Sequence, residues 1–67
     1  MKILKAQEGL FAITASKEEL RILDQALNEV CNGLPLHDFE NRLGAAHADV
    51  CRLLDQTSVA LNAAKHH

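Results

Sequence analysis

The chain lacks most of the residues that build specialised sites or stabilise very small proteins. Its 67 residues include no tryptophan or tyrosine, two phenylalanines, one proline and three glycines. So few aromatic side chains argue against an RNA-binding surface that stacks bases. Two cysteines permit one disulfide at most, which does not suggest a disulfide framework. We expect both thiols to be reduced, as is typical of a cytosolic protein.

Long apolar runs and a strong charge of one sign are also missing. No stretch approaches the roughly 20 apolar residues of a membrane span. Lys5, Gln7 and Glu8 interrupt the segment where a signal peptide would carry its apolar run. The net charge of −2 argues mildly against nucleic acid and anionic membranes as partners. We therefore expect a cytoplasmic protein without a membrane partner.

The length allows one small domain with a single compact core. A chain of this size buries only about 60% of the surface that its unfolded form exposes. Leucine, isoleucine and valine supply the apolar volume. Small domains often add a metal, a disulfide or a partner subunit to this limited core. A homodimer is therefore one expectation.

Residues 2–15 are predicted to form a two-stranded β-hairpin. Lys2–Ala6 and Leu10–Ala15 are the strand candidates, and Gly9 stands in the turn where a positive φ is needed. In the second strand, Phe11 and Ile13 would share one face, opposite Leu10, Ala12 and Thr14. An isolated hairpin is marginal in water. We expect it to lie on the helices, to pair across a dimer, or both.

A long amphipathic helix is predicted over residues 16–32. Ser16 followed by Glu19 gives a capping box at its start. Gly33 is expected to end it in a left-handed conformation, and Pro35 prevents continuation. One stripe at helical spacing forms its core face: Leu20, Leu23, Leu27, Val30 and Cys31.

Two further helices are predicted, which makes the fold α+β: a hairpin followed by three helices. A short helix covers residues 36–43 and a third covers residues 46–61, with a loose tail after it. The weak helix-forming run Thr57-Ser58-Val59 suggests a break after Gln56. The predicted inner stripe of the third helix is Ala46, Val50, Leu53, Leu54, Thr57 and Leu61.

The apolar residues of the last two helices have the spacing that is typical of a helix-turn-helix corner. Leu43 and Gly44 stand at the turn, and Val50 and Leu53 follow on the inner face. A DNA reader on this corner would use Arg42, His47, Arg52 and Gln56. Acidic residues of the same segment would repel phosphates and oppose this use: Asp38, Glu40, Asp49 and Asp55.

Metal binding and catalysis have weak support in the sequence. Cys31, His37, His47 and Cys51 are the one set suited to tetrahedral zinc, but their spacing matches no compact zinc motif. His47 lies one turn before Cys51, which would favour a thiolate. No oxyanion loop or third orienting group accompanies this pair, and no Gly-rich phosphate loop is present. We expect no enzymatic activity, no cofactor and no bound metal.

Three short blocks resemble a set of small bacterial proteins of uncharacterised function. The blocks are L-N-E-V-C-N-G at 27–33, F-x-x-R-L-G-A at 39–45 and V-x-x-L-L at 50–54. The resemblance covers roughly residues 10–56, and the first block is the specific one. Those proteins commonly place a serine cap where Ala46 stands here. The resemblance implies a bacterial cytosolic protein and carries over no activity.

The function expected from these observations is a non-enzymatic protein–protein interaction module, such as a small regulatory or immunity-type inhibitor. Its candidate binding residues are Ile22, which lies off the apolar stripe of the first helix, and the adjacent pair Asn28 and Glu29. The alternative is a small dimeric helix-turn-helix-like DNA-binding transcriptional regulator.

Overall fold

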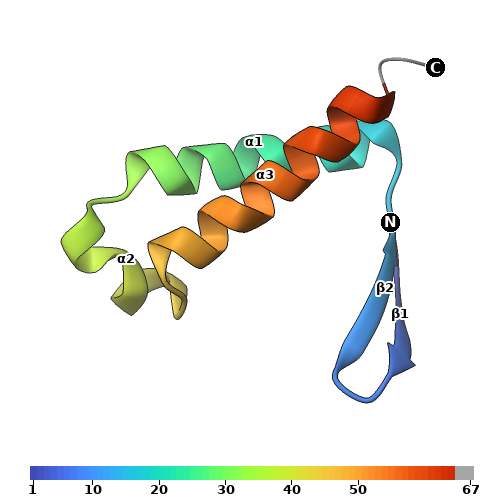
Figure 1. The fold of residues 1–67 in the computed structure, drawn as a ribbon, viewed down its shortest axis with the longest axis horizontal. Coiled ribbons are helices and arrows are strands. Elements are labelled where there is room, and N and C mark those ends of the chain that lie inside the picture. The colour runs from blue at the N-terminus through green and yellow to red at the C-terminus, as the bar shows by residue number, and fades with distance from the viewer. Residues whose placement is uncertain (65–67) are drawn as a thin grey trace.

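The computed structural model describes residues 1–64 and confirms the predicted α+β architecture. The elements run in the order β1 (Lys2–Gln7), β2 (Leu10–Thr14), α1 (Lys17–Gly33), α2 (Leu36–Leu43) and α3 (His47–Ala64). Helices α1 and α3 lie side by side and antiparallel, α2 closes one end of the pair, and the hairpin projects from the other end (Figure 1). The molecule therefore has two arms, one of strands and one of helices.

The hairpin has the predicted turn and the predicted faces. Gly9 adopts a φ of 78°, in the left-handed region that favours glycine. The antiparallel register places Ile3 opposite Ile13 and Leu4 opposite Ala12, with an irregularity in β1 between Lys5 and Gln7. Because opposed residues share a face, apolar side chains stand on both faces of this two-stranded sheet.

Helix α1 begins as predicted and ends differently. The Ser16 hydroxyl accepts a hydrogen bond from the Glu19 amide at 3.1 Å, and the Glu19 carboxylate accepts one from the Ser16 amide at 2.9 Å. Gly33 is the last helical residue and has no positive φ, so the predicted glycine stop is wrong. The chain turns at Leu34 (φ −91°, ψ 138°), because a residue before proline avoids the helical region.

Helix α3 is longer than predicted and does not break after Gln56. It starts at His47 and runs to Ala64. The Thr57 and Ser58 hydroxyls donate hydrogen bonds to the Asp24 carboxylate of α1, at 2.6 and 2.7 Å. These contacts between helices outweigh the weak local propensity. Of the predicted loose tail after residue 61, residues 62–64 are helical and residues 65–67 lie outside the described part of the chain.

The core sits where the three helices meet. Phe39 is 1% exposed and lies with Cys31 and Val50 at its centre. Partly buried apolar residues pack around them: Leu27, Val30, Leu34, Ala45, Cys51 and Leu54. Two residues of the predicted core stripes are exposed instead, Leu23 by 38% and Leu53 by 52%, and Phe11 of the hairpin is 63% exposed. The molecule measures 39 × 32 × 16 Å, so its helical arm is one layer thick and leaves these positions uncovered.

Candidate functional site

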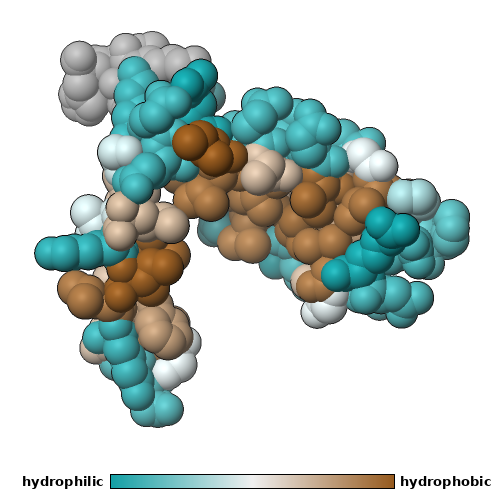
Figure 2. Space-filling view, turned by 180° about the vertical axis from the view of Figure 1, so that it is seen from behind, coloured by the Kyte–Doolittle hydropathy of each residue, from teal (hydrophilic) through white to brown (hydrophobic). Residues whose placement is uncertain are grey.

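The hairpin carries the most conspicuous exposed apolar surface of the molecule. We call it the apolar arm and define it by Ile3, Leu4, Leu10, Phe11 and Ile13. Each of these side chains is between 54% and 63% exposed. Figure 2 shows apolar side chains gathered on the hairpin and along one face of the helical arm. Large exposed apolar patches are typical of interaction sites.

The apolar arm is attached to the helices at its base alone. The Met1 amino group forms an ion pair with the Glu19 carboxylate at 2.6 Å. Among the described residues, no Cα of either strand approaches a helix Cα within 8 Å. The expectation that the hairpin packs on the helices is therefore wrong for the single chain. The physical reason is Ser16, whose extended backbone (φ −69°, ψ 163°) at the helix cap directs the strands away (Figure 1).

The ion pair and the capping box act on the same carboxylate. Hydrogen bonding to the terminal ammonium, and then to Ser16, lowers the pKa of Glu19 to about 2. Glu19 therefore stays ionised at neutral pH and connects the base of the apolar arm to the first turn of α1.

On α1, the predicted binding residues do not form one patch. Ile22 is 60% exposed and lines a shallow depression of about 250 Å³ with Arg21 and Gln25. Glu29 is exposed and lies two helical turns along on the same face as Ile22. Asn28 lies on another side, half-buried, where its side-chain oxygen accepts a hydrogen bond from Asn32 at 2.8 Å. Asn28 thus has a structural partner that the sequence did not suggest.

At the corner between α2 and α3, two of the predicted DNA-reading side chains are paired with carboxylates. Gly44 takes a φ of 69° at the end of α2, as a tight helix stop requires. Arg42 donates to Asp38 at 2.8 Å and Arg52 donates to Asp49 at 3.3 Å. Each of these cations is thereby paired within its own helix.

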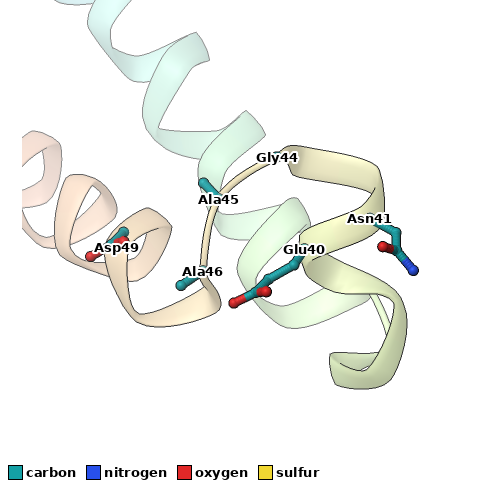
Figure 3. Close-up of a pocket in the computed structure, with 6 residues that line it drawn as sticks. All are labelled: Glu40, Asn41, Gly44, Ala45, Ala46 and Asp49. Carbon is teal, nitrogen blue, oxygen red and sulfur yellow. The ribbon is translucent and has the colours of Figure 1, made fainter.

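An open depression of about 470 Å³ lies on the outer side of this corner, lined by Glu40, Asn41, Gly44, Ala45, Ala46 and Asp49. In Figure 3 the Glu40 carboxylate extends toward Ala46, whereas Asn41 points the other way. The charged side chains that line the depression, Glu40 and Asp49, are both carboxylates. They make this surface unfavourable for a phosphate backbone.

His47 points inward and supports the fold. Its Nε2 lies 2.9 Å from the carbonyl oxygen of Cys31, and its ring packs edge-on against Phe39 with centroids 4.9 Å apart. Because a carbonyl oxygen only accepts, Nε2 must carry the proton and donate. The Cys31 carbonyl is in the last turn of α1, where helix carbonyls lack partners within the helix. His47 therefore satisfies the end of α1 from the first turn of α3.

The two cysteines lie beside this histidine. The Cys51 sulfur is 3.4 Å from Nε2 and 3.8 Å from Nδ1 of His47. Burial, followed by the hydrogen bond with Cys51, raises the pKa of Cys31 to about 11. A buried thiol with a raised pKa is a poor nucleophile. His37 is exposed on α2, and within residues 1–64 no three His, Cys, Asp or Glu side chains are arranged to hold a metal ion.

Sequence reasoning missed the Asp24 bridge between the long helices. Asp24 stands among the charged residues of α1, and its carboxylate accepts hydrogen bonds from both Thr57 and Ser58 of α3. Those hydrogen bonds, the Thr57 bond first, lower the pKa of Asp24. Two adjacent hydroxyl residues inside an otherwise apolar-spaced helix were the available signal.

Comparison with known proteins adds no relative: no family model, curated protein or solved structure matches this chain. Within residues 1–64, no helix combines the length and the hydropathy needed to cross a bilayer.

Proposed function

We propose that this chain is a non-enzymatic protein–protein interaction module of the bacterial cytoplasm, acting as a small regulator or inhibitor. The observation that carries the proposal is the apolar arm, with five large side chains more than half exposed. Complete burial of one such side chain contributes roughly 1.5–3 kcal/mol. Covering these side chains with another protein surface therefore contributes favourable free energy to association.

The chemistry of the polar residues supports a binding role over a catalytic one. His47 donates to a backbone carbonyl, and the thiol of Cys31 is buried with a raised pKa. Asp24 is occupied by two hydroxyl groups of α3. These groups are used within the fold, so they hold helices together instead of acting on a substrate.

The DNA-binding alternative receives no favourable observation from the geometry. Of its four proposed reading residues, Arg42 and Arg52 are paired with carboxylates and His47 points inward. Among the described residues, Gln56 is the one member of this set that is exposed and has neither a carboxylate partner nor an inward-pointing side chain. The depression at the corner is acidic. Protein therefore remains the favoured class of partner.

Photocross-linking tests this function directly. Benzoylphenylalanine replaces Phe11 on the apolar arm or Ile22 on α1, and Lys17, exposed on α1, serves as the control position. In a bacterial lysate we expect a discrete, saturable adduct with a different protein from position 11 or 22 and none from position 17. Adducts with a second copy alone, or no discrete adduct at all, would contradict a regulator that acts on another protein.

A further inference from the structure

We propose that the exposed edge of β2 is a self-association edge, at which a second copy of this chain adds its own β2 to form a four-stranded antiparallel sheet. The inference rests on the proposed function in treating the apolar arm as a protein-binding surface. It assigns the β2 edge of that arm to a second copy, which leaves the faces of the arm and Ile22 open to another protein. The strand order across the assembly would be β1, β2, the partner's β2 and the partner's β1.

The two edges of the hairpin differ in their protection against strand addition. Strand β1 carries Lys2 and Lys5 and has an irregularity between Lys5 and Gln7. Lysines and bulges are the features that keep edge strands from pairing with other chains. Strand β2 reads L-F-A-I-T, with no charge, no proline and a regular register from Phe11 to Thr14. The open edge is therefore β2.

The sequence of β2 is complementary to itself. In an antiparallel pair all five residues overlap when Ala12 faces Ala12 of the second copy across a two-fold axis. Phe11 then stands opposite Ile13 of the other copy, which is a favourable aromatic and β-branched pair. This register also keeps the Phe11 and Ile13 faces of both copies on the same side of the sheet, since facing residues share a side.

The size of the exposed surface fits one standard interface per chain. The accessible surface is 5330 Å², whereas a compact folded chain of 7.4 kDa exposes about 4,200 Å². The excess of about 1,100 Å² exceeds the roughly 800 Å² that each partner buries in a standard interface. The radius of gyration is 13.4 Å, against about 11 Å for a compact domain of this length. Pairing with a second copy would cover part of this excess surface.

Cysteine cross-linking and solution mass test this arrangement on the full chain. Facing residues in antiparallel strands have Cα atoms about 4.5–5.5 Å apart, within the range that a disulfide spans. We expect Ala12→Cys to form an intermolecular disulfide on mild oxidation. Leu4→Cys is the matched control, because Leu4 pairs with Ala12 on the same face but lies on the protected strand. Wild-type protein controls for cross-linking through Cys31 and Cys51.

The expected result is a wild-type mass of twice 7.4 kDa by sedimentation, with cross-linking of Ala12→Cys far above Leu4→Cys and wild type. A single-chain mass at every concentration up to about 100 μM would overturn the inference without requiring any variant to fold. A dimer in which Leu4→Cys cross-links as readily as Ala12→Cys would overturn the assignment to β2. Monomeric protein that still forms adducts with another protein would end this inference and leave the proposed function standing.

Discussion

His47 and Cys31 are joined by a hydrogen bond from the imidazole Nε2 to the carbonyl oxygen, 2.9 Å long. The bond connects the first turn of α3 to the last turn of α1, and the Phe39 ring packs against the imidazole from α2. One side chain thus holds together the ends of all three helices. This explains why a histidine at the predicted reading position of a helix-turn-helix corner faces the core.

Replacing His47 with alanine is predicted to lower the free energy of unfolding by about 1–3 kcal/mol, because the part-buried carbonyl of Cys31 loses its hydrogen-bond partner. Urea denaturation measures the change. Gln56→Ala is the matched control, since Gln56 is exposed on the same helix and should alter stability by less than about 0.5 kcal/mol. Equal stability of the two variants would show that His47 is not part of the support of the core.

The two phenylalanines are predicted to have opposite roles. Phe39→Ala should lower the free energy of unfolding by about 3–5 kcal/mol, because the side chain is 1% exposed at the centre of the helical arm. Phe11→Ala should leave the unfolding of an isolated chain nearly unchanged and weaken association, because Phe11 is 63% exposed. Denaturation at low concentration and solution mass separate these effects. A strongly destabilised Phe11→Ala monomer would mean that the apolar arm packs on its own helices.

Asp24 is predicted to make the C-terminal half of α3 sensitive to acid. Its pKa is lowered in the fold by the Thr57 and Ser58 hydroxyls, so its stabilising effect is complete above the ordinary value of 3.8. That effect is lost as the pH falls through the lower folded-state value. Amide exchange after residue 56 should accelerate in this acid range, and Asp24→Asn should remove much of the acid dependence. Asp55→Asn, at an exposed position of α3, should leave the acid dependence unchanged.

The cysteines are predicted to react at different rates with iodoacetamide at pH 8. Cys31 is 6% exposed and its pKa is raised to about 11, so only about one thiol in a thousand is ionised. Cys51 is half-buried and should be labelled first. Mass spectrometry follows both sites, and protein unfolded in urea provides the equal-rate reference. Faster labelling of Cys31 in the folded protein would contradict the burial described for it.

Local rules predicted the parts of the fold that depend on neighbouring residues. The Ser16–Glu19 capping box, the positive φ of Gly9 and the helix stop at Gly44 all follow from residue types within a few positions. The prediction for Gly33 failed because Pro35 restricts Leu34 first. Within such short stretches the sequence is largely sufficient.

The parts of the fold that the sequence did not predict depend on contacts between residues far apart in the chain. Asp24 and Thr57 are 33 positions apart, and His47 and Cys31 are 16 apart, so neither pair gives a local signal. The exposure of Phe11 could not be predicted from the sequence either, because an aromatic residue in a strand is usually part of a core. Whether a second layer covers a strand depends on how the chain is arranged in space.

Amide hydrogen exchange of the hairpin in the purified protein tests the central claim that the β2 edge of the apolar arm binds a second copy of the chain. We predict that the amides of β2 from Phe11 to Thr14 become more protected from exchange as the protein concentration rises. Outward-facing amides of β1 should stay fast, because that edge remains uncovered. Equally fast exchange of both strands at every concentration would contradict the account, since it would show an arm that no second copy covers.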